Sequence, residues 1–271
     1  LDDSLKGRFE IIRSPHWSFA ECEESFGFTL DDFLFFGGFP GAAPFVNDHR
    51  RWLAYMRDSI IDPTISKDVL EGEHVRKPAL LRALFDLGAR FSAQELSYNK
   101  MLGQLDDAGN TVTLAHYLEL LDRASVLRGL PKFHNNELKQ RSSSPRLLVY
   151  DASLMTAALG RTQEVVLSDS ELRGHLVETA VGAHLLAILS GTYDDLFWWR
   201  EQNSEVDFVV SSGERLVAIE VKSGRKKAAR GMSAFLSKNP TAMKLIVGGS
   251  GPDSCPLDTF LRSEALEDII Y

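Results

Sequence analysis

The sequence predicts a multi-domain α/β protein, in which helical segments come first and a compact α/β domain with a central mixed sheet comes last. Apolar residues recur at helical spacing through much of residues 45–130, whereas residues 195–222 hold three short apolar runs of strand length. The last part alternates helices with strands, which is typical of an α/β domain. We therefore divide the chain into four parts, residues 1–25, 26–77, 78–150 and 151–271.

The composition is that of an ordinary globular chain, with 271 residues, 44% of them hydrophobic, 25% charged, and a formal net charge of −8. No run of about eighteen apolar residues occurs and no signal segment opens the chain, so we expect a cytoplasmic protein without a membrane span. Cys22, Cys255 and the seven histidines show no metal-ligand spacing, which favours reduced thiols and no zinc site. Because the opening Leu1-Asp2-Asp3-Ser4 is typical of internal sequence, we expect a longer protein.

The first 77 residues predict the end of another domain followed by a helical linker. Ser18 is placed to start a helix, and an aromatic-rich run over residues 28–39 leads into the turn sequence Gly37-Gly38-Phe39-Pro40-Gly41. Residues 45–70 carry apolar side chains at helical spacing. We expect Asp62-Pro63 to bend or break that helix, because proline lacks the donor that the helix needs.

The third part predicts three helices followed by a β-hairpin. The first helix begins with Pro78, the second follows the capping-box pattern Ser92-Ala93-Gln94-Glu95, and the third begins at Thr113. Two strand-like runs, residues 126–131 and 145–150, flank a polar tip. This order is that of a winged helix, a helix-turn-helix variant that often binds DNA.

The predicted hairpin is basic although the whole chain is acidic. Residues 123–146 hold six basic side chains against one acid, Glu137. Such a patch is a directed electrostatic surface that suits phosphate groups. We expect nucleic-acid contacts from Arg128, Lys132, Lys139, Arg141 and Arg146, and from Arg200 in the next domain. The alternative interpretation is a solvated loop on a module that only packs against other domains.

The last part predicts the order helix, strand, strand, strand, helix, strand. A long apolar helix runs from Gly174 to Leu189, and Ser211-Ser212-Gly213 joins two of the strands as a hairpin. The remaining elements are strands at residues 195–200, 205–210, 216–222 and 244–247 and a helix at residues 228–237.

Three charged residues interrupt the apolar strands of this domain. Asp207 lies inside Glu205-Val206-Asp207-Phe208-Val209-Val210, and Glu220 and Lys222 lie inside Ala218-Ile219-Glu220-Val221-Lys222. Strands bury alternate residues, and a buried charge is costly unless it is paired or bound to a metal. The hairpin brings Asp207 beside Glu220 and Lys222, which share one face. The alternative to a metal site is a surface ion pair of these acids with Lys222 or Arg200.

The arrangement favours a divalent metal site for phosphodiester chemistry. Asp207 and Glu220 offer the oxygen ligands that Mg²⁺ or Mn²⁺ prefers, and Glu178 on the preceding helix can add a third carboxylate. Lys222 can orient a water nucleophile or stabilise charge on a phosphate. A bound ion of this kind lowers the pKa of water and neutralises charge that develops on the scissile group.

These four residues resemble the site of the PD-(D/E)XK nuclease superfamily, which has the restriction-endonuclease-like fold. In that superfamily a helix acid, a strand Asp and a Glu-x-Lys form the site. Glu178, Asp207, Glu220 and Lys222 match it position by position. The resemblance implies that these four residues are catalytic and that Asp207 and Glu220 bind the metal.

Further motifs resemble the C-terminal half of a large family of prokaryotic AAA-type ATPases. In chain order they are Ser4-Leu5-Lys6-Gly7-Arg8-Phe9, Ser18-Phe19-Ala20-Glu21, Gly37-Gly38-Phe39-Pro40, His116-Tyr117-Leu118, Val149-Tyr150-Asp151, Trp199-Arg200 and Glu205-Val206-Asp207-Phe208. The resemblance implies that residues 1–25 are the tail of an ATPase domain, with Arg8 as its nucleotide-sensing arginine. No Gly-x-x-x-x-Gly-Lys-Ser/Thr occurs here, so we expect ATP binding only with an upstream P-loop domain.

Two functions from different classes remain open from the sequence. The first is a DNA-binding region of an ATPase with a Mg²⁺-dependent nuclease-like site, which the complete set of three acids and a lysine favours. The second is a non-catalytic regulatory region that binds protein partners, which the net charge of −8 favours. Because AAA-type proteins commonly form rings, the resemblance also allows an oligomer.

Overall fold

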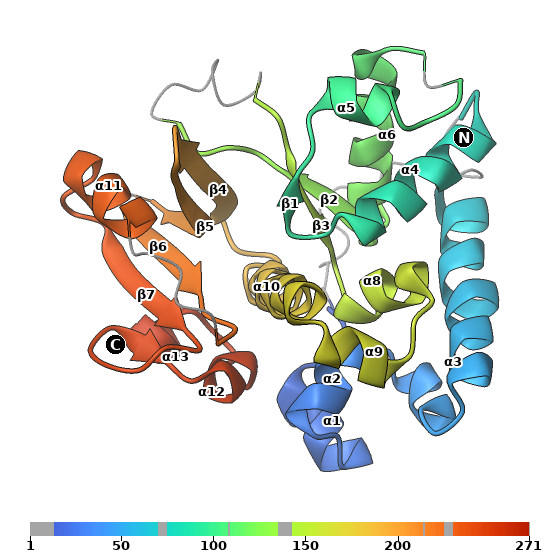
Figure 1. Ribbon diagram of the computed structural model, residues 1–271, viewed down its shortest axis with the longest axis horizontal. Coiled ribbons are helices and arrows are strands. Elements are labelled where there is room, and N and C mark those ends of the chain that lie inside the picture. Colours follow the sequence, from blue (N-terminus) through green and yellow to red (C-terminus); the bar gives the residue numbers. More distant parts are fainter. Residues whose placement is uncertain are drawn as a thin grey trace, which may run out of the picture.

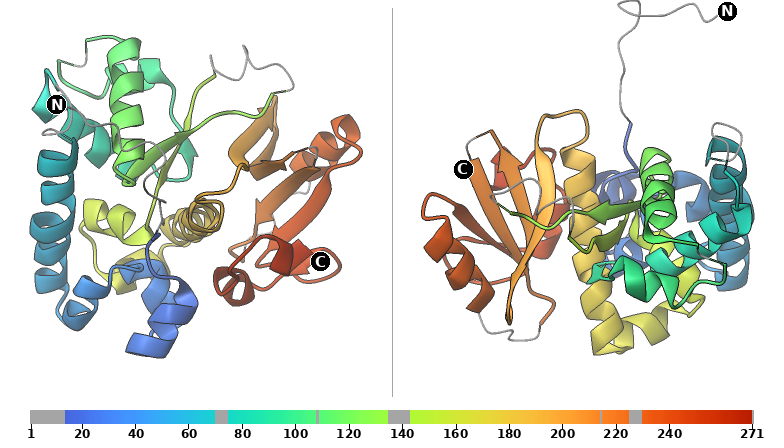
Figure 2. Two further views of the ribbon diagram at one scale, coloured as in Figure 1. Left: turned by 180° about the vertical axis from the view of Figure 1, so that it is seen from behind. Right: turned by 90° about the horizontal axis from the view of Figure 1, so that it is seen from above.

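The computed structural model describes residues 14–69, 75–107, 109–134, 143–213, 215–224 and 230–270. Most helices gather on one side and a five-stranded sheet lies on the other, with the long helix α10 (Ser170–Ile188) between them (Figure 1). The views from behind and from above show the same arrangement (Figure 2). Both halves of the molecule therefore pack against α10.

The chain enters through short helices that their own side chains cap. Ser18 and Glu21 form a capping box at the start of the first helix, and Thr29 and Asp32 form another at the start of the second. The aromatic run ends where the sequence predicts, because Gly37 closes the second helix with a φ of 66°. The elements are α1 (Phe19–Phe26), α2 (Leu30–Phe36), the 3₁₀ helix η1 (Pro40–Phe45) and α3 (His49–Tyr55).

Asp62-Pro63 does not break the helix, which was one of the two outcomes that the sequence predicted there. Helical turns continue beyond α3 through the π-helical segments η2 (Met56–Ile61) and η3 (Thr64–Val69), and Asp62 and Pro63 are helical between them. Proline removes one hydrogen bond from an α-helix and clashes with the preceding turn. Here the flanking turns are already widened to π geometry, which accommodates the ring without ending the helix.

The central part folds as three helices and a small antiparallel sheet. Its elements are α4 (Pro78–Arg90), β1 (Gln94–Glu95), α5 (Tyr98–Leu102), α6 (Thr111–Arg123), β2 (Leu127–Leu130) and β3 (Arg146–Val149). The three helices and the two hairpin strands match the prediction, but the predicted capping box is wrong. Ser97 caps α5, and Gln94 and Glu95 of the predicted box form β1 instead. The strand order is β1-β3-β2, because Glu95 and Leu130 pair with Arg146 from opposite sides.

The last part is a mixed sheet with helices on both faces. The strands are β4 (Asp195–Glu201), β5 (Ser204–Ser212), β6 (Arg215–Val221), β7 (Met243–Val247) and β8 (Ser254–Cys255). They pair in this order, the first three antiparallel and the last two parallel. The helices are α8 (Ala152–Leu159), α9 (Gln163–Ser168), α10, α11 (Arg230–Lys238), α12 (Leu257–Leu261) and α13 (Glu267–Ile270). The predicted order of helix and strands is confirmed from α10 to β7.

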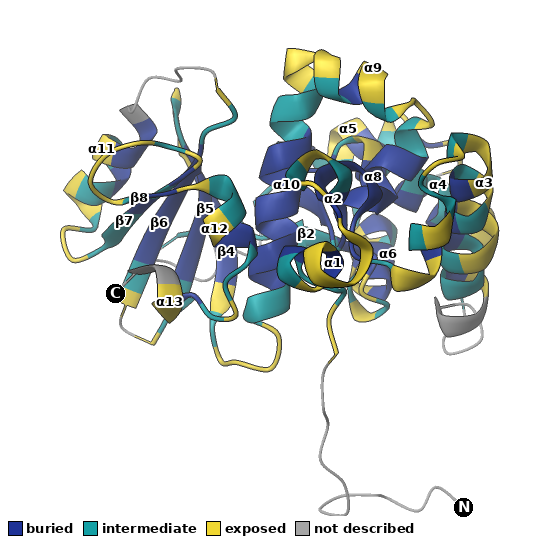
Figure 3. Ribbon diagram, turned by 90° about the horizontal axis from the view of Figure 1, so that it is seen from below, coloured by how far each residue is buried: buried dark blue, intermediate teal, exposed yellow. Residues whose placement is uncertain are grey.

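Two apolar clusters hold the sheet between its covering helices (Figure 3). The larger cluster runs from Trp52 in the helical part through Phe208 of the sheet to Phe260 in α12, so the parts of the chain share one core. The smaller cluster lies on the other face, where Val209 packs with Phe235 of α11. Each fully buried side chain of this size stabilises the fold by about 1.5–3 kcal/mol. Among the described helices, none has the length and apolarity needed to cross a bilayer.

Candidate acidic site at the end of the five-stranded sheet

Asp207 lies at an irregularity of strand β5. The pairing of β4 with β5 shifts by one residue between Phe197 and Trp199, so β5 carries an extra residue there. Asp207 and Phe208 occupy this β-bulge. Bulges bend a strand and redirect its side chains, and they are frequent next to functional sites. The regular alternation that the sequence suggests is therefore interrupted at Asp207 itself.

The carboxylate of Asp207 takes the place of a main-chain acceptor between β5 and β6. Regular pairing of these strands starts at Phe208 and Ile219, so it ends next to Asp207 on β5 and next to Glu220 on β6. There the Val221 N–H donates to Oδ2 of Asp207 over 2.8 Å. The ladder of the hairpin thus ends at the site, and Asp207 is only 3% exposed.

Arg146, the first residue of β3, connects the small sheet to this site. Its Nη2 lies 3.0 Å from Oε2 of Glu178 on α10 and 3.7 Å from Oδ1 of Asp207. Its Nη1 donates to the main-chain oxygen of Asp207 over 3.1 Å and to Glu205 over 3.2 Å, and its Nε donates to the Ala93 carbonyl over 2.8 Å. Every guanidinium nitrogen has an acceptor, as the burial of a charge requires.

The position of Arg146 corrects one expected nucleic-acid contact. Its side chain is 3% exposed and faces carboxylates, so it does not present its charge to a phosphate backbone. The physical reason is that all four residues of β3 are buried, which leaves Arg146 no exposed face of the hairpin from which to reach nucleic acid.

Lys222 neutralises another acid of the site. Its Nζ lies 2.8 Å from Oε1 of Glu220, two residues earlier on the same strand. The ion pair that the sequence allowed as an alternative is therefore present. Glu220 is only 7% exposed, however, so the carboxylate of this ion pair is buried and does not lie on the surface.

The pKa of Asp207 is raised to about 7. Burial is the largest cause, and the negative charges of Glu178 and Glu220 raise the pKa further, whereas Arg146 and the Val221 amide lower it. Functional sites often shift a pKa in this way, because they combine desolvation with like charges. The raised pKa of Asp207 thus follows mainly from its burial, which the charge of Arg146 offsets only in part.

The described residues contain no group of three or more histidine, cysteine, aspartate or glutamate side chains arranged to hold a metal ion. Arg146 contacts Glu178 and Asp207, and Lys222 contacts Glu220, so basic side chains lie where a cation is needed. The donor chemistry nevertheless fits a hard divalent cation, since carboxylate oxygens in a negative, desolvated setting are what such ions prefer. Metal binding here requires that these basic side chains give way.

Two further predicted nucleic-acid contacts are engaged with acids of the chain. Arg200 forms ion pairs with Glu205 and, at 2.6 Å, with Glu95. Arg128 lies 3.9 Å from Asp122 on α6. Arg200 therefore does not pair with Asp207 or Glu220, as one of the sequence alternatives had it.

The other predicted contacts are placed only in part. Lys132 lies over the ring of Trp198, with its Nζ 5.7 Å from the ring centroid. Lys139, Arg141 and the predicted nucleotide-sensing Arg8 lie outside the described residues.

Two residues near the site, His175 and Glu205, were not predicted from the sequence. The Nδ1 of His175 lies 3.9 Å from Oε2 of Glu178, one helical turn away. That i,i+3 spacing is visible in the sequence and provides a signal for His175. Glu205 accepts hydrogen bonds from both Arg146 and Arg200, a role that only the assembled fold reveals.

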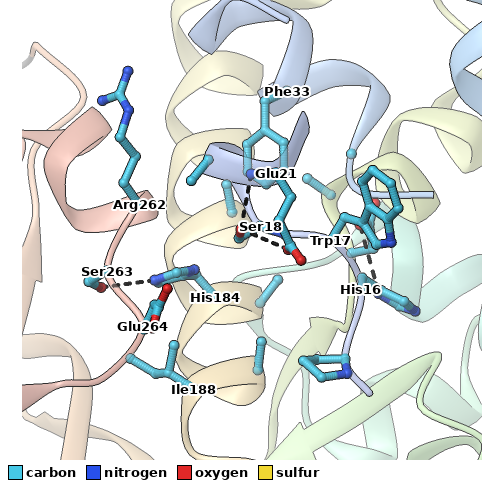
Figure 4. Close-up of a pocket in the computed structure, with 18 of the residues that line it drawn as sticks. His16, Trp17, Ser18, Glu21, Phe33, His184, Ile188, Arg262, Ser263 and Glu264 are labelled. Carbon is cyan, nitrogen blue, oxygen red and sulfur yellow. Dashed lines mark hydrogen bonds and ion pairs between the residues drawn. The ribbon is translucent and has the colours of Figure 1, made fainter. Parts of the chain in front are cut away.

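A cavity of about 400 Å³ lies along the C-terminal half of α10, separate from the acidic site (Figure 4). His184 of α10 lines it, with its Nε2 3.1 Å from the Ser263 hydroxyl. Burial lowers the pKa of His184 to about 4, so the ring is neutral at physiological pH. None of the sequence-predicted site residues lines this cavity.

Comparison with protein families divides the chain close to the start of α10. A family model described as a domain of unknown function, DUF8612, matches residues 27–165, just over half of the chain. The chain belongs to the DUF8612 family. A second domain of unknown function, DUF4143, matches residues 173–258. This second domain is often found at the C-terminus of AAA-ATPase-like proteins.

Two mycobacterial proteins are similar to this DUF8612 chain. They are uncharacterized protein Rv2008c of Mycobacterium tuberculosis (strain ATCC 25618 / H37Rv) and uncharacterized protein Mb2031c of Mycobacterium bovis (strain ATCC BAA-935 / AF2122/97). Each is 27% identical over 224 residues, which cover 81% of this chain and 48% of the relative. The chain thus spans about half the length of the curated relatives it matches. No solved structure matches it.

The acidic site is built across both matched regions. Glu178, Asp207, Glu220 and Lys222 lie within the DUF4143 match, whereas Arg146 lies within the DUF8612 match. The DUF8612 region therefore supplies the guanidinium that contacts the carboxylates of the DUF4143 region.

Proposed function

We propose that this chain is the C-terminal region of an AAA-type ATPase and carries a metal-dependent nuclease-like site that acts on DNA. The observation that carries the proposal is the burial of Glu178, Asp207 and Glu220 around one end of the sheet, with Lys222 beside them. Such a concentration of desolvated acids costs stability, so a fold that keeps it has a use for it.

The arrangement of the elements supports a restriction-endonuclease-like fold. The order α10, β4, β5, β6, α11, β7 follows the helix, three strands, helix and strand that the sequence predicts for that fold. Asp207 lies where the hairpin of β5 and β6 loses its regular pairing, next to the Glu-x-Lys strand. The acids therefore lie at the point where the regular pairing of the two strands ends.

Each residue has a distinct role in the proposed reaction. Asp207 and Glu220 would hold a Mg²⁺ or Mn²⁺ ion, and Glu178 would complete the acidic set from α10. When bound, such an ion lowers the pKa of water and neutralises charge on the phosphate. Lys222 would orient the attacking water and stabilise negative charge on the phosphate oxygens. Its contact with Glu220 holds its Nζ beside the acids.

The order α4, β1, α5, α6, β2, β3 supports a winged helix, with the three-stranded sheet as its wing. The exposed face of α6 carries His116 and Glu119, a mixture that suits base reading poorly. Phosphate contact through Lys132 and the predicted basic tip beyond it is the better candidate, because basic side chains bind the phosphate backbone whatever the base sequence.

The proposed ATPase context rests on the DUF4143 match and on the length of the relatives. ATP would be bound by a P-loop domain in the rest of such a protein, because the sequence given has no Gly-x-x-x-x-Gly-Lys-Ser/Thr. Ring formation and cytoplasmic location follow from the same proposed context.

A cleavage assay on plasmid and branched DNA, with Mg²⁺ or Mn²⁺, tests the nuclease proposal. We expect nicking that requires the metal, that Asp207→Asn abolishes, and that Asp195→Asn retains. Asp195 is a matched control, because it is an exposed acid at the start of β4. Nicking that survives in Asp207→Asn, or that needs no metal, would contradict the proposed site.

A non-catalytic regulatory region is the second candidate, and a specific observation favours it. Arg146 contacts Glu178 and Asp207, and Lys222 contacts Glu220, so each predicted acid has a partner in the chain. On this reading the acids serve to join the two regions, and the partner of the chain is a protein. This candidate would be favoured if the wild type cleaves no DNA with either metal and if it binds a protein partner in the absence of DNA.

A further inference from the structure

The cavity along the C-terminal half of α10 lies between parts of the chain that are far apart in sequence (Figure 4). Residues around the start of α1, residues of α10 and residues 262–264 after α12 line its volume of about 400 Å³. Binding sites for small molecules usually measure about 300–1,000 Å³ and combine apolar walls with a few polar groups. None of the four proposed catalytic residues lines this cavity, so a ligand of its own can bind there.

His184 offers the cavity a buried hydrogen-bond acceptor. Its Nε2 lies 3.1 Å from the hydroxyl of Ser263, and that hydroxyl donates its single proton to the Phe260 carbonyl over 2.7 Å. The Nε2 of His184 therefore carries the ring proton and donates it to Ser263. Because burial keeps the ring neutral at physiological pH, Nδ1 has a lone pair, and no hydrogen bond joins it to another described residue.

Acidic side chains outnumber basic ones around the cavity. The carboxylates that line it are those of Glu21, Glu24, Asp151 and Glu264. Glu24 and Glu264 are exposed and form no ion pair with another residue in the described ranges. Arg262 also lines the cavity, but Glu23 at 2.9 Å and Asp258 at 2.8 Å already engage its guanidinium. The cavity therefore has an uncompensated negative charge.

The thiol of Cys22 on α1 responds to this negative charge. Burial raises its pKa to about 12, and the charges of Asp151 and Glu21 add to the rise. A potential that hinders ionisation of a thiol attracts a cation to the neighbouring space.

The remaining walls suit the apolar or aromatic body of a ligand. Trp17 and Phe33 line the cavity, and the faces of such rings attract cations as well as apolar carbon. Ala180, Ala183 and Ala187 of α10 also line it. They recur at helical spacing on one face, and their short side chains leave the space beside the helix open.

We propose that this cavity binds a small organic cation, in which an ammonium or amidinium group is attached to an apolar or aromatic body. The cation donates to Nδ1 of His184 and lies among the carboxylates, while the body contacts Trp17 and the alanine face of α10. An anion would instead meet carboxylates and a nitrogen lone pair. The proposal is independent of the nuclease-like function, because the two concern different residues.

Titration of the 271-residue chain with tryptamine tests the proposal. Tryptophol is the matched neutral ligand, because a hydroxyl replaces the ammonium group, and indole-3-acetate is the anionic one. We expect tryptamine to bind about tenfold more tightly than tryptophol, and indole-3-acetate to bind least. Labelling the alanine methyl groups with ¹³C locates the ligand by NMR in the wild type, where the signals of Ala180, Ala183 and Ala187 should shift.

Filling the cavity should prevent binding. Ala187→Leu places a larger side chain in it, on a helix that accepts leucine readily, and we expect about a tenfold or greater loss of tryptamine affinity. Ala115→Leu is the matched control, because Ala115 is exposed on α6. Circular dichroism of both variants checks that they are folded.

Removing one charge should weaken the cation alone. Glu264→Gln is expected to lower tryptamine affinity about two- to fivefold and to leave tryptophol affinity unchanged. Glu164→Gln is its control, since Glu164 is exposed on α9 and does not line the cavity. It should bind both ligands as the wild type does.

Tryptamine shifts at the three alanine methyls, together with the preference over tryptophol, support the proposal. Equal affinities for tryptamine and tryptophol, or tighter binding of indole-3-acetate, overturn the cationic class of ligand. Absence of tryptamine binding, or binding that leaves the three methyl signals of the wild type unshifted, overturns the site itself. The second result needs no substitution, so a variant that fails to fold does not obscure it.

Discussion

The guanidinium of Arg146 and the carboxylate of Glu178 form a buried ion pair, with 3.0 Å between Nη2 and Oε2 and with 3% and 8% of the two side chains exposed. The pair joins the first residue of β3 to the middle of α10. Buried ion pairs offset their desolvation cost only where further hydrogen bonds satisfy the charges. Arg146 donates such bonds to the carbonyl oxygens of Ala93 and Asp207. The pair therefore fixes the small sheet against the acidic site.

Replacing Arg146 by methionine is expected to destabilise the protein strongly. Arg146→Met leaves Glu178 and Asp207 buried without their cation, and breaking a buried pair from one side costs about 3–5 kcal/mol. Urea denaturation at pH 8 measures the loss as a difference in the free energy of unfolding. Lowering the pH should reduce the loss, because the unpaired acids then take up protons.

Arg123→Met provides the matched control for that prediction. Arg123 forms an ion pair with Glu119 on the exposed face of α6, where both side chains are more than half exposed. Such pairs contribute about 0.3–0.5 kcal/mol, so this variant should unfold almost as the wild type does. An equal effect of the two substitutions would show that the Arg146 network contributes no more than a surface pair.

The raised pKa of Asp207 predicts that stability falls as the pH rises toward 8. In the unfolded chain its carboxyl ionises at the ordinary value of 3.8, whereas in the folded protein it keeps its proton up to about pH 7. The stability contributed by this proton is present below pH 4 and is lost as the pH rises through 7. Asp207→Asn removes the ionisation, so it should be more stable than the wild type at pH 8 by about 2–4 kcal/mol.

Urea denaturation of both proteins at pH 4.5 and pH 8 checks this expectation. The advantage of Asp207→Asn should shrink at the lower pH, and the exposed control Asp195→Asn should show no pH-dependent difference. Saturating Mn²⁺ should also reduce the advantage, because an ion that binds the folded wild type stabilises it. An Asp207→Asn protein that is less stable at pH 8 would mean that the ionised carboxylate is fully compensated.

Much of the acidic site follows from local sequence pattern. Asp207 and Glu220 were expected on adjoining strands because a short turn ending at Gly213 separates two apolar runs, and that hairpin is present. Gly213 has a φ of 59°, which a turn of this kind requires and which glycine adopts without strain. Glu178 was expected on a helix, and α10 holds it. These placements depend on spacing of 2 and 3.6 residues, which the sequence carries directly.

Other features of the site depend on packing that no local pattern records. Arg146 is a charged residue beside a polar hairpin tip, where the sequence favours exposure to solvent. Its burial follows from the approach of β3 to α10 and β5. The β-bulge at Asp207 adds one residue to β5 without any marker such as glycine or proline. The π-helical turns around Pro63 likewise override a local rule. Tertiary contacts chose these conformations over the ones that local propensity favours.

Gly231 fixes the closest approach of α11 to the sheet, and Gly231→Ala is expected to destabilise the protein. A Cβ at this position would lie 1.7 Å from the main-chain oxygen of Glu205, and backbone atoms cannot move aside as a flexible side chain can. The expected loss is about 3 kcal/mol, the upper end of the cost of overpacking.

Gly103→Ala is the control, because its Cβ would meet nothing closer than 3.6 Å and its φ is −73°. It should leave stability within about 0.5 kcal/mol of wild type or raise it slightly. Equal unfolding free energies for the two variants would contradict the close approach of α11.

His184 predicts an acid sensitivity of opposite sign to that of Asp207. Burial lowers the pKa of its imidazole from 6.5 to about 4. Between these two pH values the imidazole is therefore protonated in the unfolded chain and neutral in the folded protein. The stability of the neutral ring is present above pH 6.5 and is lost as the pH falls toward 4, by up to about 3 kcal/mol. His184→Gln keeps a polar group near Nε2 for the Ser263 hydroxyl and removes the titration, so its stability relative to wild type should improve between pH 7.5 and 4.5. Urea denaturation of the two proteins measures this change as a double difference, in which the contribution of Asp207 cancels because both proteins carry it. An NMR titration that places the His184 pKa near 6.5 would contradict the prediction, since the ring would then exchange its proton as freely as in the unfolded chain.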